Sequence, residues 1–143
     1  MNQSRFSPRR EPGQALIETA LVVPILLLLA LGVVGVGRVL QAQLAVSAVS
    51  REAARAAAVA DTATAAESQG HSRGGEVAEG YGLTRGALVL SIDPGTFQRG
   101  GRVRASAHYE VVLDDLPLLS WARISVASQH AEPIDLYRSR WGA

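Results

Sequence analysis

The chain has 143 residues and a formal net charge of +1, and all fourteen of its basic residues are arginine. A chain of this length has room for one small domain once a membrane segment is subtracted. A net charge close to zero creates no strong field to attract nucleic acid, so nucleic acid is not an expected partner. Because the chain contains no cysteine, disulfide frameworks and thiolate metal sites are excluded.

Residues 1–13 are polar and contain Arg5, Arg9 and Arg10, with prolines at two positions and a glycine at the end. Proline and glycine at this density disfavour a regular helix or strand. We therefore interpret residues 1–13 as a basic leader.

Residues 14–37 form an apolar segment, and the nineteen residues from Thr19 to Gly37 carry no charge. As a helix this run spans roughly 28 Å, close to the bilayer hydrocarbon core of about 30 Å. The alternative is a buried helix of a soluble domain, but so small a domain could not cover such a helix on all sides. The segment predicts a single-pass transmembrane helix, which makes membrane lipid an expected partner.

Residues 38–69 contain neither proline nor glycine and are rich in alanine, which favours the same helix continuing as a stem outside the membrane. Apolar residues recur every three or four positions along one face: Val39, Ala42, Val46, Val49, Ala53 and Ala56. We call this face the seam. Its small residues permit close approach of a helix from another subunit, or they pack on the C-terminal domain of the same chain. Sequence alone leaves both alternatives open.

Residues 70–85 are glycine-rich and polar, which predicts a loop or a weak helix. Residues 86–143 predict a small β-rich domain. Its clearest alternation places six apolar side chains on one face of a strand: Val103, Ala105, Ala107, Tyr109, Val111 and Leu113. Shorter strands are expected near residues 88–92 and 124–131. The predicted fold is therefore α+β, with a long N-terminal helix and about three antiparallel strands packed on its outer half.

Glu18 stands inside the apolar segment, where a carboxylate is costly unless it is paired. The alternative is a carboxylate that simply extends into the headgroup region. If the chain were cut between Gly13 and Gln14, the new α-amine would lie four residues before Glu18, one helical turn away. That amine has a pKa of about 8 and is largely charged at neutral pH. Pairing between the amine and Glu18, within or between subunits, would set the register of neighbouring subunits.

Pro24 lies inside the same apolar helix. Proline lacks the N–H that would bond to the carbonyl of Ala20, so we expect a helix kink there. The alternative is that proline is simply common in membrane helices.

No phosphate-binding loop, dinucleotide fingerprint or nucleophile elbow occurs in the chain. His71, His108 and His130 lack acidic partners at metal-ligand spacing, and no serine has an evident base. We expect a protein that is not an enzyme, with no catalytic residue, no metal, no cofactor and no small-molecule substrate.

Residues 13–24, GQALIETALVVP, resemble the start of the TadE-like proteins, minor pseudopilins of the tight-adherence (Flp) pilus system. Residues 50–57, SREAARAA, are similar to a second recurrent stretch of that family. The resemblance implies that a prepilin-type peptidase cuts after Gly13 on the cytoplasmic side and that the apolar helix is retained. It also implies other pilin or pseudopilin subunits and the pilus assembly machinery as partners.

Two functional hypotheses follow. In the first, the chain is a pilus assembly component in the cell membrane or a surface filament, with a cytoplasmic N-terminus and an extracytoplasmic C-terminal domain. In the second, it is an uncleaved, single-pass, membrane-anchored binding module that does not enter a filament. Cleavage after Gly13 distinguishes the two.

Overall fold

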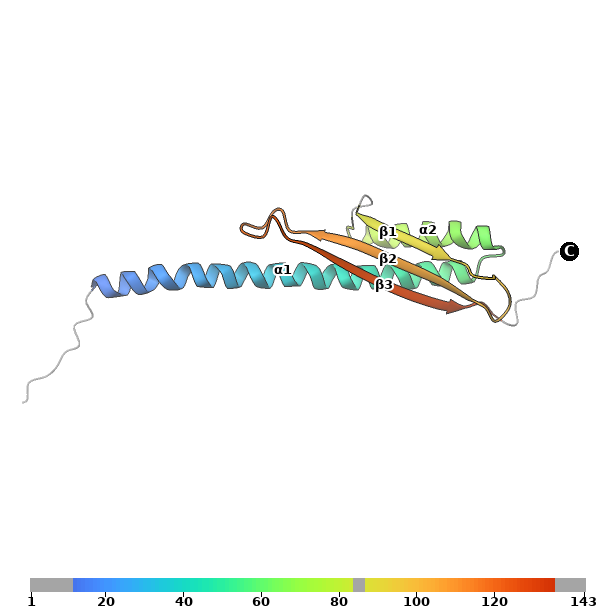
Figure 1. Cartoon of the computed structure of the whole chain (residues 1–143), viewed down its shortest axis with the longest axis horizontal. Helices are drawn as coiled ribbons and strands as arrows, with labels where there is room; N and C mark the ends of the chain where they lie inside the picture. Colours follow the sequence, from blue (N-terminus) through green and yellow to red (C-terminus); the bar gives the residue numbers. More distant parts are fainter. Residues whose placement is uncertain (1–11, 84–86, 136–143) are drawn as a thin grey trace, which may run out of the picture.

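The computed structural model describes residues 12–83 and 87–135 (Figure 1). The elements in chain order are α1 (Pro12–Ala58), α2 (Ala63–Gly80), β1 (Leu88–Asp93), β2 (Arg102–Val112) and β3 (Arg123–Pro133). A long apolar N-terminal helix followed by a small antiparallel sheet is the α+β fold that the sequence predicts. Leader residues 1–11, residues 84–86 and the C-terminal residues 136–143 lie outside the described part of the chain.

The stem expected at 38–69 is divided in the structure, because α1 ends at Ala58 and a second helix, α2, covers residues 63–80. Of the loop or weak helix expected at 70–85, the structure shows a helix as far as Gly80. Thr62 begins the second helix from an extended backbone conformation, and its Oγ1 accepts a hydrogen bond from the Ala65 N–H at 3.1 Å. This is an N-cap, which satisfies one of the free N–H groups of the first turn. The chain therefore reverses direction, and α2 returns along α1 (Figure 1).

The glycines that predicted a loop instead allow α2 to pack closely. The buried face of α2 consists of small residues four positions apart: Ala66, Gly70, Gly74 and Ala78. A Cβ at Gly70 would lie 3.0 Å from Ile92 Cδ1, and a Cβ at Gly74 would lie 3.2 Å from Ala53 Cβ. Here the glycines make room for α1 and the sheet rather than break the helix.

Gly82 ends α2 with a positive φ of 72°. Its N–H donates to the carbonyl of Glu79, and the N–H of Leu83 donates to the carbonyl of Ala78, both at 2.9 Å. This pair of bonds is a Schellman motif, which satisfies free carbonyls at the end of a helix and requires the left-handed conformation that glycine adopts at little cost.

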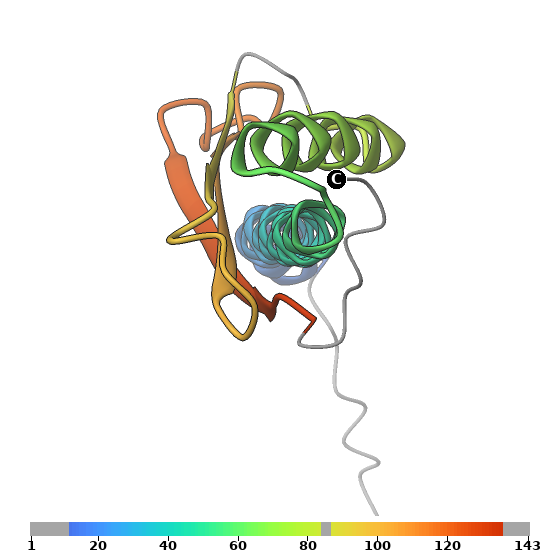
Figure 2. The same ribbon diagram turned by 90° about the vertical axis from the view of Figure 1, so that its right-hand side faces the viewer.

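The sheet has the order β1-β2-β3, and both pairings are antiparallel. Ala105, in the middle strand, lies opposite Ile92 of β1 and His130 of β3. The face predicted to be apolar is buried, apart from Tyr109, which is half-buried. Figure 2, which looks along α1, shows the sheet as one layer and the two helices as the other.

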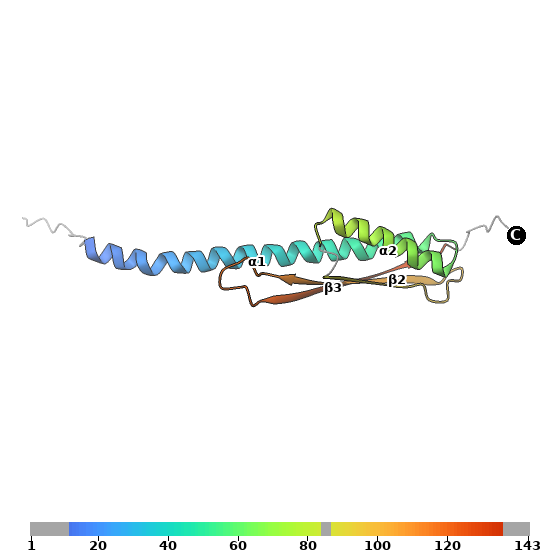
Figure 3. The same cartoon turned by 90° about the horizontal axis from the view of Figure 1, so that it is seen from above.

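The core lies along the C-terminal half of α1 and is built mainly from alanine and valine. Val46, Val49 and Val103 are its largest fully buried apolar side chains. The buried hydroxyl of Ser50 donates to the carbonyl of Ser47 and is hydrogen-bonded to Ser128 Oγ on β3, each at 3.1 Å. The core therefore holds the sheet on one half of α1 only, which leaves the other half outside the domain (Figure 3).

Candidate functional site

Residues 13–30 of α1 project from the domain with no part of the described chain against them (Figures 1 and 3). Residues 13–30 are all exposed, and their leucines, isoleucines and valines are among the most exposed apolar residues of the molecule. Leu26, for example, keeps 58% of its surface. Water is a poor solvent for so much apolar area, and α1 is long and apolar enough to cross a membrane. The candidate site is residues 13–37 of α1, and we call this segment the apolar stem.

The residues predicted to control processing and register lie at the start of the apolar stem. Gly13 and Gln14 are exposed in the first turn of α1, and Glu18 is exposed one turn later. Thr19 Oγ1 donates to the carbonyl of Ala15 at 2.9 Å, so this polar side chain is satisfied within the helix. No other described part of the chain contacts Gly13, since a Cβ there would meet nothing within 4 Å. The bond after Gly13 and the Glu18 carboxylate are therefore both accessible to other molecules.

Pro24 lies in the interior of α1, which continues without interruption from Pro12 to Ala58. Its neighbours on the helix are exposed apolar side chains. The proline is therefore placed in the uncovered part of the apolar stem, away from the core.

The seam is largely covered by the chain's own domain. Ala42, Val46, Val49 and Ala53 are buried, and Val39 and Ala56 are half-buried. Ala42, Val46 and Val49 belong to a core cluster that also contains residues of α2, β2 and β3. Ala53 belongs to a second core cluster, together with residues of α2, β1 and β2. Of the two alternatives left open by the sequence, packing on the chain's own domain is the one present in this structure.

Arg38 closes the apolar run, and its guanidinium forms a bidentate ion pair with the carboxylate of Asp115. The second of the two hydrogen bonds, from Nη2 to Oδ2, measures 2.6 Å. This charged hydrogen bond holds the pKa of the Asp115 carboxyl below its ordinary value. Asp115 precedes β3 by several residues, so the pair ties the β2–β3 connection to the point where the apolar stem ends.

Residues 13–55 match the TadE-like protein family. The match confirms the family resemblance predicted from the sequence. It covers the whole apolar stem and the first buried turns of α1, and the sheet lies outside it. No curated protein and no solved structure matches the chain.

The TadE-like segment thus has two physically different parts. Its first part is the apolar stem, of which residues 13–30 are left uncovered by the described protein. From Ala42 onwards its inner face is buried against α2 and the sheet. The TadE-like segment therefore joins a surface suited to lipid or other helices directly to the domain core, within one helix.

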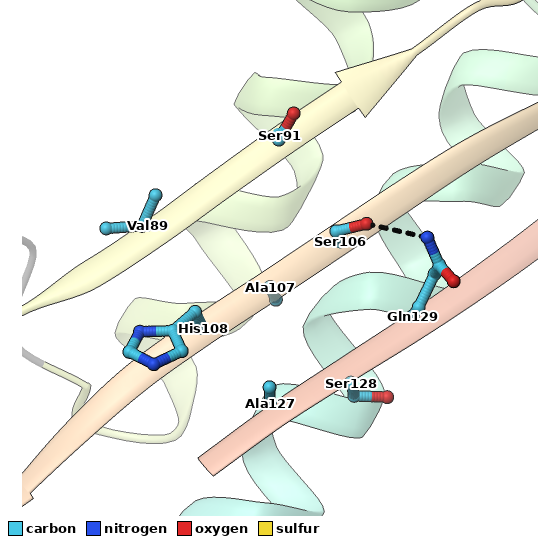
Figure 4. A pocket seen from close by; sticks show the side chains of 8 residues that line it. All are labelled: Val89, Ser91, Ser106, Ala107, His108, Ala127, Ser128 and Gln129. Atoms are coloured by element: carbon cyan, nitrogen blue, oxygen red, sulfur yellow. Dashed lines mark hydrogen bonds between the residues drawn. The ribbon is translucent and has the colours of Figure 1, made fainter. Parts of the chain in front are cut away.

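A second candidate site lies on the outer face of the sheet, outside the TadE-like segment. It is a shallow hollow of about 400 Å³ lined by Val89, Ser91, Ser106, Ala107, His108, Ala127, Ser128 and Gln129 (Figure 4). Ser106 Oγ accepts a hydrogen bond from Gln129 Nε2 at 3.1 Å, and an amide cannot serve as a base for a serine nucleophile. None of the lining residues is a carboxylate.

The histidines that were considered as metal ligands are not brought together. His108 lies opposite Val89 and Ala127 and is exposed on the outer face. His130 lies opposite Ala105, with its Nε2 3.2 Å from an oxygen of Glu132. Within residues 12–83 and 87–135, no group of three or more potential ligands forms a metal site.

Sequence reasoning missed two features that build the site. The Arg38–Asp115 pair joins residues 77 positions apart, and the local sequence pattern does not predict a pair between such distant residues. The close packing of α2 was missed because the glycine content of residues 70–85 predicted a loop or a weak helix. The period of four in Ala66, Gly70, Gly74 and Ala78 was the available signal, since small residues at that spacing share one helix face.

Proposed function

We propose that this protein is a minor pseudopilin, an assembly component of a tight-adherence (Flp-type) pilus or a related secretion filament. The observation that supports this proposal is the coincidence of the TadE-like match with the apolar stem. A helix that is apolar on all sides and uncovered by its own domain needs lipid or neighbouring helices around it. Pilin or pseudopilin subunits and the assembly machinery are the proposed partners, and the cell membrane or a surface filament is the proposed location.

The start of the apolar stem suggests how subunits are processed and aligned. A prepilin-type peptidase would cut between Gly13 and Gln14, which are exposed and contact no other described part of the chain. The new α-ammonium of Gln14 would then lie one helical turn from Glu18, on the same face of α1. Neutralisation of Glu18 by that amine, in the same or a neighbouring subunit, would remove the cost of a lone carboxylate near lipid.

The first experiment determines the N-terminus of the protein extracted from membranes, by intact mass and N-terminal sequencing. The proposal expects a chain that starts at Gln14. A Gly13→Leu variant is the control, and it should keep the full-length mass because the cleavage site is altered. A wild-type chain that keeps residues 1–13 would contradict the proposed processing and favour the alternative, an uncleaved single-pass binding module that does not enter a filament.

The second experiment tests the role of Glu18 in subunit association. Glu18→Gln removes the charge with little change in size, and Glu67→Gln does the same at an exposed position on α2. The proposal expects weaker cross-linking to partner subunits for Glu18→Gln and wild-type cross-linking for Glu67→Gln. Equal cross-linking in both variants would refute the register role.

The third experiment tests the orientation of α1. Because the chain has no cysteine, a single Val59→Cys substitution at an exposed position just after α1 provides a unique label site. A membrane-impermeant maleimide should label it in intact cells if the domain is extracytoplasmic. Labelling only after the membrane is permeabilised would show the opposite orientation.

A further inference from the structure

The β2–β3 connection, residues 113–122, extends beyond the sheet along α1 toward the apolar stem (Figures 1 and 3). Two of its leucines pack against Gly35, where a Cβ would lie 3.5 Å from Leu119 Cδ1 and 3.7 Å from Leu113 Cδ1. Leu31 lies one turn closer to the N-terminus and is partly buried against the core cluster that contains Leu113. The bidentate pair of Arg38 and Asp115 fixes the connection at this level.

The level of this connection relative to a bilayer follows from the charges on α1. Twenty residues separate Glu18 from Arg38, which is a rise of about 30 Å along a helix and matches the thickness of the hydrocarbon core. With Glu18 at the inner boundary, Arg38 therefore lies at the outer boundary. Gly35, which contacts the connection, lies about 4.5 Å deeper. The connection thus reaches the lipid interface instead of standing in water above it.

The connection exposes two large apolar side chains at this level. Leu118 keeps 68% of its surface and Trp121 keeps 80%, whereas Leu113 and Leu116 are buried in the core. Leu113 and Leu116 therefore cover the end of the core, whereas other residues of the connection project away from it. Leu118 and Trp121 belong to the second group.

Four of the N–H groups beside these two side chains are satisfied within the connection. Trp121 Nε1 donates to the carbonyl of Leu118 at 3.0 Å. Three backbone N–H groups, those of Leu116, Leu119 and Ala122, donate to carbonyls three residues earlier, at 2.8 to 3.1 Å. A segment with its donors already bonded loses less on leaving water, and tryptophan is enriched at membrane interfaces.

We propose that Leu118 and Trp121 insert into the outer lipid interface and that the β2–β3 connection is a second membrane contact of this protein. The ligand is the phospholipid boundary between headgroups and acyl chains, next to the exit of α1. The inference rests on the proposed function in one respect only, that α1 spans the membrane. It takes Glu18 as the inner boundary of the span, but it does not depend on cleavage, on a role of Glu18 in subunit register or on entry into a filament.

The backbone of Leu118 provides a variant that removes its side chain without strain. Leu118 has a φ of 66°, a conformation that is costly for a bulky residue and easy for glycine. Leu118→Gly should therefore leave the fold intact. Any loss of membrane contact in that variant reports on the side chain.

The test uses the full chain in phospholipid vesicles, with Trp141→Phe so that Trp121 is the sole tryptophan. The emission of Trp121 should shift to the blue on reconstitution. Lipids brominated near the headgroup end of the acyl chain should quench it more than lipids brominated near the chain terminus, and aqueous iodide should quench it little. Leu118→Gly in the same background should reduce the blue shift and increase quenching by iodide.

The matched control places the sole tryptophan at Val59, through Val59→Trp with Trp121→Phe and Trp141→Phe. Val59 is exposed and lies twenty-one residues after Arg38, just past the end of α1, so the probe is about 30 Å farther along the helix. Its tryptophan should be quenched by iodide and not by bromolipid. Insertion of α1 is measured separately, by resistance of the vesicle-bound chain to extraction with alkaline carbonate.

Each outcome has one meaning. If α1 resists extraction but Trp121 is quenched by iodide as strongly as the Val59 probe, this inference fails and the proposed function stands. If Trp121 is shielded from iodide yet not quenched by bromolipid, another protein chain covers it and the inference also fails. If carbonate extracts the chain, both the inference and the proposed membrane anchor fail.

Discussion

The glycines of α2 give the sharpest test of the packing described above, because neighbouring positions have opposite surroundings. Gly74 faces α1 and the sheet, and a Cβ there would overlap Leu90 Cδ2 and lie 3.2 Å from Ala53 Cβ. A Cβ at Gly75 would meet nothing within 4 Å. Both residues are inside the same helix, so Gly74→Ala and Gly75→Ala differ in packing and share the change in helix propensity.

The expected magnitudes follow from these distances. Alanine in place of glycine inside a helix stabilises by about 1 kcal/mol. Gly75→Ala should show this gain, whereas Gly74→Ala also incurs an overpacking cost of about 1–3 kcal/mol. The difference in the free energy of unfolding between the two variants is that overpacking cost. For a domain of this size, it corresponds to about 4–8 °C in Tm for each kcal/mol.

The assay is thermal unfolding in a mild detergent, followed by far-UV circular dichroism. A Leu90→Ala background provides the confirming measurement, because it removes the atom that the new Cβ would overlap. Gly74→Ala should then cost less than it does in wild type, a coupling expected for residues in contact. A Gly74→Ala variant at least as stable as Gly75→Ala would refute the close packing of α2.

Three further predictions concern single contacts. Val103→Ala, at a fully buried position, should destabilise the protein by about 2 kcal/mol. Val89→Ala, at a position 64% exposed, should change stability by less than about 0.5 kcal/mol. Equal effects of the two substitutions in urea unfolding would argue against the assigned sheet face. Thr62→Ala should cost about 1 kcal/mol through loss of the N-cap bond, and Thr64→Ala, at the second residue of α2, should not. A Thr62→Ala variant as stable as wild type would mean that α2 does not begin there. Because Arg38 lowers the pKa of Asp115, the ion pair should contribute fully above the unfolded pKa of about 3.9 and be lost as pH falls through the lower folded value. The stability difference between wild type and Asp115→Asn should therefore be constant near neutral pH and shrink below about pH 4; a difference that persists unchanged in acid would contradict the assigned pair.

The sheet and the apolar stem were predictable because each depends on a local pattern. The alternation of apolar and polar residues along β2 predicts which side chains face the core, without information about the rest of the chain. The nineteen uncharged residues that end at Gly37 predict a helix long enough to cross the hydrocarbon core of a bilayer. The three strands lie close to the expected residues, and one continuous helix covers the whole apolar segment.

The remaining features depend on contacts between distant residues, which local patterns do not specify. Glycine at positions 70 and 74 is consistent with a loop and with a close helix contact, and only the presence of Ala53 and Leu90 opposite decides between them. The seam has a clear period, but the period does not name the partner. The pairing of Arg38 with Asp115 places the β2–β3 connection beside the apolar stem. The sequence does not reveal this pairing, so it gives no reason to expect the connection at that position.

The small size of the core residues accompanies a long contact between α1 and the rest of the domain. A core built mainly from alanine and valine buries little apolar area per residue, so its stability depends on close approach of backbones over a long contact. The contact is long because α1 runs through the domain without a break, from the apolar stem to Ala58. Arg38 and Gly35 then attach the β2–β3 connection below the core, which leaves no free linker between the stem and the sheet. A rotation or axial shift of the stem would therefore also move the sheet.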